Sequence, residues 1–216
     1  MKIERGIFVT GTGTGVGKTV VSALLVATLR KQSPVVYWKP VQTGIERDCD
    51  TSAVKALAGC DPSEIHEAGI RLKRPLSPHL AARLEGVSIT VKDITDLAEN
   101  GPKTEFWIVE GAGGVLVPLN ENELMIDLII ELGLPSIVVS STGLGTINHS
   151  LLTIDCIRSR GGEVAGVVMN GEPNRENSSA ISDYGKVTIL AEVPVLRPLT
   201  AGAIAKAAGK MDFGLI

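Results

Sequence analysis

The chain has 216 residues, of which 44% are apolar and 3% aromatic, and 21 Lys and Arg against 24 Asp and Glu give it a net charge of −3. This size and apolar content are typical of one α/β domain, predicted here over residues 1–216. The charge lacks the basic excess that nucleic-acid binding needs, and no apolar stretch reaches the ~20 residues of a membrane-spanning helix. Neither nucleic acid nor a membrane is therefore expected as a partner.

Short apolar runs rich in Val and Ile alternate along the chain with stretches of helical periodicity. Strands are predicted at Gly6–Thr10, Val35–Lys39, Phe106–Glu110, Ser136–Ser140 and Val164–Asn170, and helices at Thr19–Lys31, Leu124–Leu132, Thr146–Arg160 and Thr200–Lys210. The least regular part runs from Pro40 to Pro78, where Gly, Pro and charged residues interrupt short helical pieces. Near-continuous apolar strands indicate a sheet covered on both faces. The order predicts a doubly wound, mostly parallel α/β sheet with helices on both faces.

The cysteines and the first residues indicate where the protein works. Cys49, Cys60 and Cys156 are far apart and have neither CxxC nor metal-ligand spacing, as expected of reduced thiols. The segment Met1–Arg5 leads directly into a strand pattern and does not resemble a signal peptide. A cytoplasmic protein is predicted.

A glycine-rich loop follows the first predicted strand. Residues 11–19 read Gly-Thr-Gly-Thr-Gly-Val-Gly-Lys-Thr and lead into a helix that begins near Lys18. Glycines allow backbone N–H groups to converge on a polyphosphate, Lys18 can reach the β and γ oxygens, and the Thr19 hydroxyl can bind magnesium. Gly11 stands one residue earlier than the usual first glycine, so the loop is one residue longer than usual. The pattern predicts a P-loop NTPase-like nucleotide site, and a tight turn without a ligand is the alternative.

Magnesium bound by Thr19 also needs a carboxylate. Glu110 ends a buried strand and precedes the bend Gly-Ala-Gly-Gly at 111–114, so it is expected to face the phosphates, although it could cap the following segment. Asp48 and Asp50, just before a helical stretch, are further candidates, with an N-cap as the alternative role. The pattern alone does not choose between these two aspartates.

Five segments together resemble the dethiobiotin synthetase family. They are the loop with Thr10 before it, Trp38–Gly44 (Trp-Lys-Pro-Val-Gln-Thr-Gly), Ser77-Pro78-His79, Val109–Gly114 (Val-Glu-Gly-Ala-Gly-Gly) and Leu144–His149 (Leu-Gly-Thr-Ile-Asn-His). They occur in the family's order, and the match extends roughly over residues 6–170.

The resemblance implies a ligase of biotin biosynthesis that uses 7,8-diaminononanoate, carbon dioxide and ATP with Mg²⁺. In such an enzyme one amine forms a carbamate, ATP phosphorylates the carbamate, and the second amine closes the ureido ring of dethiobiotin. Lys39 would bind the carbamate and the transferring phosphate, with Lys18 as the second catalytic cation. Asp50, rather than Asp48, would join Thr19 and Glu110 as a magnesium ligand.

The resemblance also implies the remaining site residues. Asn170 would contact the adenine edge with Pro194–Leu196 packing near the base, and Gly145–Asn148 would present backbone N–H groups to the substrate carboxylate from a neighbouring subunit, which implies a homodimer. The expected nucleotide-binding residues are Gly15, Val16, Gly17, Lys18, Thr19, Val20, Asp50, Glu110, Gly111, Ala112, Gly113, Asn170, Gly171, Pro194, Val195 and Leu196. The expected substrate-binding residues are Thr14, Thr43, Gly145, Thr146, Ile147 and Asn148.

Some features separate this chain from relatives and rivals. Some family members carry acidic residues at the places of Gly13 and Gly15. A P-loop amidoligase with another acceptor generally carries a glutaminase portion, whose Cys and His elements are missing here. A ParA- or MinD-like switch usually has a lysine early in the loop, whereas this loop has none before Lys18, and Met211–Ile216 has no basic cluster.

Overall fold

The computed structural model describes residues 3–46, 48–103 and 105–215. Met1, Lys2 and Ile216, from the terminal segments interpreted above, lie outside the described residues. The strands are β1 Gly6–Gly11, β2 Val35–Trp38, β3 Val41–Thr43, β4 Ile65–His66, β5 Ile70–Leu72, β6 Phe106–Glu110, β7 Ser136–Ser141, β8 Val164–Asn170 and β9 Ile189–Val193. The helices are α1 Lys18–Leu29, α2 Asp50–Ala58, α3 Pro78–Glu85, α4 Val91–Ala98, α5 Met125–Leu132, α6 Thr146–Ser159, α7 Arg175–Gly185 and α8 Ala201–Ala208, with a short 3₁₀ turn at Pro62–Glu64.

Seven strands form one sheet in the order β4-β2-β6-β1-β7-β8-β9, and each described pairing within it is parallel. The central strand β1 pairs with β6 on one side and β7 on the other. The chain passes from β1 to β2 on the first side and later builds β7, β8 and β9 on the second, so the strand order changes direction beside β1. Ligands of open α/β sheets bind at such a point, beyond the carboxyl ends of the strands. The predicted doubly wound α/β fold is confirmed.

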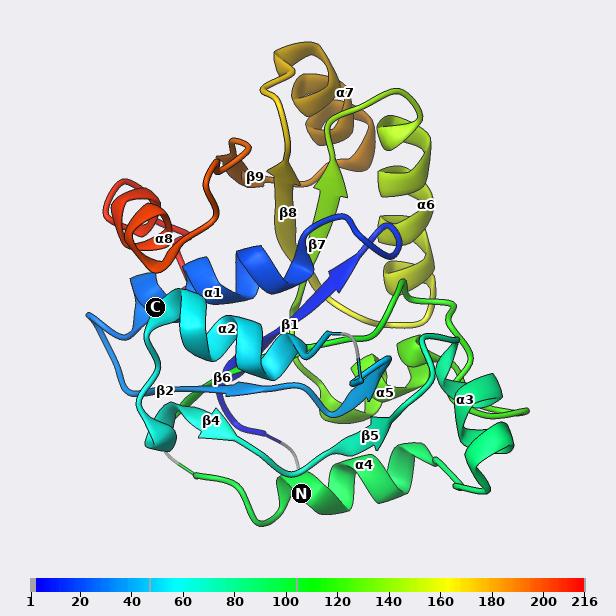
Figure 1. Ribbon diagram of the computed structural model, residues 1–216. Coiled ribbons are helices and arrows are strands. Elements are labelled where there is room, and N and C mark those ends of the chain that lie inside the picture. Colours follow the sequence, from blue (N-terminus) through cyan, green and yellow to red (C-terminus); the bar gives the residue numbers. More distant parts are fainter. Residues whose placement is uncertain (1–2, 47, 104, 216) are drawn as a thin grey trace.

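Alternate side chains of each central strand enter different hydrophobic clusters, which is why these strands are apolar almost throughout. On β1, Phe8 packs on one face, whereas Ile7 and Val9 pack on the other. Helices α1, α2 and α8 cover the face of Ile7 and Val9, and α3 to α7 cover the face of Phe8 (Figure 1). Both faces are thus shielded from water, as parallel sheets require.

Most predicted elements are confirmed, with small changes at their ends. The second strand ends at Trp38, so Lys39 lies just beyond it, and the first helix ends at Leu29 instead of Lys31. Thr200 lies outside α8 as its N-cap, where its hydroxyl accepts a hydrogen bond from the Ala203 N–H at 3.2 Å. A threonine at this position satisfies a free N–H of the first turn and so begins the helix.

The structure adds three short strands to Pro40–Pro78, where the sequence predicted only short helical pieces interrupted by Gly, Pro and charged residues. This stretch contains β4, which extends the main sheet, and β3 and β5, which pair in parallel as a separate two-stranded sheet. Strands of two or three residues are too short to show an alternating pattern, so periodicity does not reveal them. Three further helices, α3, α4 and α7, and the edge strand β9 were also not predicted.

The described residues include no helix with both the length and the apolar character needed to cross a membrane.

Candidate active site

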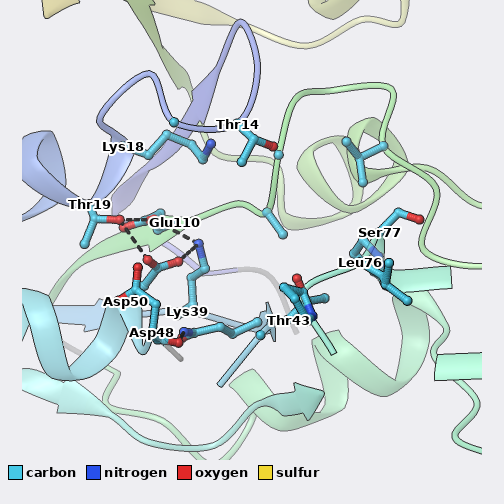
Figure 2. Close-up of a pocket in the computed structure, with 18 of the residues that line it drawn as sticks. Thr14, Lys18, Thr19, Lys39, Thr43, Asp48, Asp50, Leu76, Ser77 and Glu110 are labelled. Carbon is cyan, nitrogen blue, oxygen red and sulfur yellow. Dashed lines mark hydrogen bonds and ion pairs between the residues drawn. The ribbon is translucent and has the colours of Figure 1, made fainter. Parts of the chain in front are cut away.

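A cavity of about 620 Å³ opens beyond the carboxyl ends of β1, β2 and β6. Its residues come from the glycine-rich loop on one side and from the chain around β3 and α3 on the other, as Figure 2 shows. The predicted residues among them are Thr14, Gly15, Gly17, Lys18, Thr19, Lys39, Thr43, Asp48, Asp50, Glu110, Ala112 and Gly113. The fold therefore collects into one place segments that are up to a hundred residues apart in sequence.

The glycine-rich loop depends on two glycines in left-handed backbone conformations. Gly15 has φ +78° and Gly17 has φ +98°, and Gly17 is the N-cap of α1. A Cβ on Gly17 would collide with the Asn170 side-chain amide, whereas a Cβ on Gly13 would meet open space. Left-handed backbone is strained for residues with a side chain, so Gly15 and Gly17 let the loop turn its N–H groups toward an anion.

Four polar side chains meet on the floor of the cavity. The Thr19 hydroxyl lies 3.0 Å from Asp50 Oδ1 and 3.1 Å from Glu110 Oε1. The Lys39 ammonium lies 2.6 Å from Asp50 Oδ2 and 2.8 Å from Glu110 Oε1, and it donates to the Gly111 carbonyl at 2.9 Å (Figure 2). We call Thr19, Lys39, Asp50 and Glu110 the polar cluster.

Backbone register explains how the polar cluster forms. Trp38 of β2 pairs with Val109 of the parallel strand β6. The residues that come next along the two chains, Lys39 and Glu110, therefore also lie side by side. The Arg71 guanidinium holds the Lys39 carbonyl at 2.8 Å, which fixes the chain where it leaves the sheet.

The structure gives different surroundings to the two aspartates that the residue pattern alone left open and of which the resemblance implies Asp50. Asp50 is the first residue of α2, whose N-cap is Cys49, so the N-cap role does not belong to Asp50. Its carboxylate contacts Thr19 and Lys39, whereas Asp48 is exposed and lines the cavity. The buried amide of Gln42 donates to the Asp48 carbonyl at 2.9 Å and steadies this turn.

Burial and neighbouring charges shift the pKa values of three side chains that line the cavity, Lys18, Lys39 and Asp50. Burial lowers the pKa of Lys18 to about 8, and the nearby charge of Lys39 contributes. Burial alone would lower the pKa of Lys39, but the carboxylates of Glu110 and Asp50 outweigh it and raise the pKa. Burial alone would raise the pKa of Asp50, but Lys39 beside it holds the pKa below its ordinary value. The ion pairs thus keep Lys39 and Asp50 charged, while Lys18 loses its proton more easily than an ordinary lysine.

The predicted base-binding residues gather at a neighbouring strand edge. The Asn170 amide donates to the Val16 carbonyl at 2.9 Å, and the Gly171 N–H donates to the Val193 carbonyl at 2.9 Å. Pro194, Val195 and Leu196 follow β9 and line a second cavity of about 640 Å³ between β9 and α8. Val20 lies in the first turn of α1 and packs against the core on that face. Asn170 at the end of β8 therefore contacts the glycine-rich loop, and Gly171 after it contacts the end of β9, beside this second cavity.

The predicted carboxylate-binding segment Gly145–Asn148 lies elsewhere, at the start of α6. Gly145 is the N-cap of α6 with φ +92°, and Leu144 before it is fully exposed. The described residues that line the first cavity do not include this segment. Within one chain, the structure does not bring it to the polar cluster.

Several cavity residues were not predicted. Gln42, Gly44, Pro75, Leu76, Ser77, Pro78 and Val117 line the cavity, and Figure 2 shows Leu76 and Ser77 across from Lys18. Ser77 and Pro78 belong to the Ser-Pro-His segment, which was a signal that something at this position mattered. The Tyr37 hydroxyl also reaches Glu110, and the two-residue period of a strand could have revealed it, because Tyr37 precedes Lys39 by two positions.

Comparison with known proteins adds to this geometry. A family model described as an AAA domain matches residues 5–203. The chain is 46% identical to the ATP-dependent dethiobiotin synthetase BioD of Paramagnetospirillum magneticum over 93% of each chain, and 44% identical to that of Lawsonia intracellularis over 89% of each. Among solved structures, the cell-division ATPase MinD of Pyrococcus furiosus has a TM-score of 0.58 at 16% identity, covering 95% of this chain and 97% of its own. At that identity the likeness to MinD concerns the fold alone.

Proposed function

The chain belongs to the AAA-domain family and, within it, to the ATP-dependent dethiobiotin synthetases, and we propose that its polar cluster is the centre of that reaction. The enzyme is a ligase that forms C–N bonds and converts 7,8-diaminononanoate, carbon dioxide and ATP into dethiobiotin, ADP and phosphate. The observation that carries the site assignment is the contact of Lys39 with Glu110 and Asp50 beside the phosphate loop.

The polar cluster fits a magnesium ion in its donor chemistry. A hydroxyl and two carboxylates, from Thr19, Asp50 and Glu110, supply hard oxygen ligands, which Mg²⁺ prefers together with phosphate oxygens and water. When bound, magnesium would neutralise charge on the β- and γ-phosphates. The same two carboxylates form the ion pairs of Lys39, so metal and ammonium share their ligands.

The two lysines account for the charge that the reaction develops. A carbamate forms when one amine attacks carbon dioxide and loses a proton. Its oxygen then attacks the γ-phosphorus, the bond to ADP breaks, and Lys18 and Lys39 stabilise the negative charge on the transferring group. The second amine attacks the carbamoyl carbon, phosphate leaves, and the amine loses its proton, which closes the ring.

The walls of the cavity suit the rest of the substrates. Thr14 and Thr43 offer hydroxyls from opposite sides, and Pro75, Leu76 and Val117 offer apolar surface for the carbon chain of the diamine. The site holds the acceptor in line with the phosphoryl group, which replaces an encounter in solution by a reaction between oriented groups. Asn170, Gly171 and Pro194–Leu196 take the base.

A homodimer completes the site in this proposal. A helix start such as that of α6 favours a nearby carboxylate, and the exposed Leu144 beside it supports a contact with a second copy. Replacing Leu144 with Asp should shift the protein toward monomers in sedimentation analysis and raise the KM for the diamine. A monomeric wild-type protein with full activity would overturn this arrangement. The proposal also takes the chain as one domain and as a cytoplasmic enzyme.

The reaction is tested by measuring phosphate release from ATP with Mg²⁺ and bicarbonate, with and without 7,8-diaminononanoate. We expect release that depends on the diamine and a product with the mass of dethiobiotin. Phosphate release at the same rate without the diamine would instead indicate an NTPase or a different acceptor.

A further inference from the structure

Tyr37 is a buried aromatic residue whose hydroxyl donates to Glu110 Oε2 at 3.0 Å. Both side chains are 0% exposed. We propose that Tyr37 is a positioning residue for magnesium, holding the Glu110 carboxylate so that its other oxygen faces Thr19 and the metal. This inference rests on the proposed role of Glu110 as a metal ligand and extends it to a residue beyond the cavity wall.

The two carboxylate oxygens of Glu110 have different hydrogen-bond partners. Oε1 faces the cavity, where Thr19 and Lys39 donate to it at 3.1 and 2.8 Å. Oε2 faces the interior under the sheet end, where Tyr37 donates to it. The carboxylate is therefore held from both sides, and its plane is fixed.

Strand alternation explains why Tyr37 can do this. Side chains two positions apart on a strand point to the same face, so Tyr37 lies on the side of Lys39 and Glu110. The intervening Trp38 packs in the cluster on the opposite face, where its indole N–H donates to the Ala68 carbonyl at 2.6 Å. Tyr37 belongs to the apolar core cluster on that face, and Ile108 pairs with it on β6.

Filling space would not require the hydroxyl. Phenylalanine has nearly the same shape, so a purely structural role for the ring predicts that Tyr37→Phe changes little. Loss of the hydroxyl would leave Glu110 Oε2 buried without a donor, and a buried charged oxygen without a partner is strongly disfavoured. The carboxylate would then turn toward other donors and present poorer geometry to a metal.

The test measures metal binding directly, without turnover. Mn²⁺, which accepts the same oxygen ligands, is titrated into protein saturated with a non-hydrolysable ATP analogue, and free Mn²⁺ is followed by EPR. We expect Tyr37→Phe to weaken Mn²⁺ binding by about 10- to 100-fold, as substitutions behind metal ligands do. Trp38→Phe is the matched control, because it removes a buried donor from the next residue of the same strand. The Mn²⁺ affinity of this variant should stay within about twofold of the wild-type value.

A double-mutant cycle separates this inference from the proposed function. Glu110→Gln should weaken Mn²⁺ binding by itself, and Tyr37→Phe should then add less than about twofold. No effect of Glu110→Gln would mean that Glu110 is not a ligand, and the proposed metal site would fail. Three results would overturn the role of Tyr37 and leave the metal site intact. The first is that Tyr37→Phe weakens Mn²⁺ binding just as strongly in the Glu110→Gln protein, and the second is that Trp38→Phe weakens it equally. The third is that Tyr37→Phe leaves Mn²⁺ binding unchanged where Glu110→Gln weakens it.

The wild-type protein offers a second measurement that does not depend on how the variants fold. The chain has two tyrosines, Tyr37 and Tyr184, and Tyr184 is 79% exposed on the surface. With tyrosine labelled by ¹³C at the hydroxyl-bearing carbon, adding Mg²⁺ to the protein bound to the ATP analogue should shift the Tyr37 signal and leave the Tyr184 signal in place. An unmoved Tyr37 signal at saturating Mg²⁺ would contradict the inference.

Discussion

Lys39 directly follows β2, Glu110 ends the neighbouring parallel strand β6, and the Lys39 ammonium lies 2.8 Å from Glu110 Oε1 with both side chains almost completely buried. Asp50 completes the arrangement at 2.6 Å from the same ammonium. With Asp48, three carboxylates and the two lysines Lys18 and Lys39 line the cavity, which leaves an excess of one negative charge. Net charge therefore does not attract an anionic nucleotide to the site, and binding must depend on specific contacts.

The first prediction concerns Lys39. Lys39→Ala should leave binding of the ATP analogue with Mg²⁺ nearly intact and lower kcat by about 10²- to 10³-fold, because the removed cation acts on charge that develops during phosphoryl transfer. Binding is measured by calorimetry and kcat by phosphate release. The control is Lys92→Ala, which removes an exposed lysine paired with Asp96. A collapse of nucleotide affinity in parallel with kcat would contradict the assigned role.

The second prediction compares two aspartates separated by one residue. Asp50→Asn should raise the Mg²⁺ concentration needed for half-maximal turnover by about tenfold or more, because the neutral amide is a poorer ligand for a hard cation. Asp48→Asn should leave that concentration unchanged, because Asp48 is exposed, and the Thr19 hydroxyl contacts the Asp50 carboxylate. Equal Mg²⁺ dependence in the two variants would count against Asp50 as a ligand.

The third prediction follows from the pKa of Lys18, which burial lowers to about 8. Below pH 8 the ammonium is charged and ready to bind phosphate. Above pH 8 the free enzyme has lost this proton, and binding of an anionic nucleotide must take it up again. The affinity should therefore fall as pH rises from about 8, by at most about tenfold per pH unit.

Calorimetry in buffers of different ionisation enthalpy would detect this proton uptake. Lys18→Arg provides the control, because arginine stays protonated in this range. The pH dependence above 8 should disappear in that variant, and its persistence would assign the proton to another group.

The fourth prediction concerns the glycines of the phosphate loop. Gly17→Ala should weaken nucleotide binding by about tenfold or more, because the left-handed backbone costs ~1–2 kcal/mol for a residue with a side chain and the new Cβ collides with Asn170. Gly13→Ala should bind nucleotide almost normally, since its Cβ meets open space. Fluorescent-nucleotide titrations of both variants would decide, and equal losses would show that the loop is sensitive at every position.

The sequence predicted the part of the fold in which local pattern and burial agree. The strands β1, β2, β6, β7 and β8 are apolar on both faces, and this is visible without a structure. The short strands β4 and β5 depend on partners distant in sequence, and Ile65–His66 alone carries no period to detect. Whether such a short segment forms a strand depends on its pairing with other segments, which its own sequence does not reveal.

The candidate site divides in the same way. Glu110 ends β6, and Lys18 and Thr19 come after the loop that follows β1, so they lie at the same edge of the sheet, and the structure brings them together. The residue pattern alone did not choose between Asp48 and Asp50, because helix starts are uncertain by a residue or two from sequence. The family resemblance implied Asp50, which is the first residue of α2. Gly145–Asn148 has its predicted partner in another copy of the chain, and that assignment stays a prediction.

The passage of the chain from Lys39 to Val41 crosses from one sheet to another. Lys39 leaves the seven-stranded sheet, and Val41 begins the small β3–β5 sheet that carries Thr43 into the opposite wall. In the proposed site, phosphate chemistry and acceptor recognition are therefore built on separate sheets joined through Pro40. If the proposal holds, redesign for diamines of other lengths would target the β3–β5 sheet and the start of α3, and would leave the two proposed catalytic lysines unchanged.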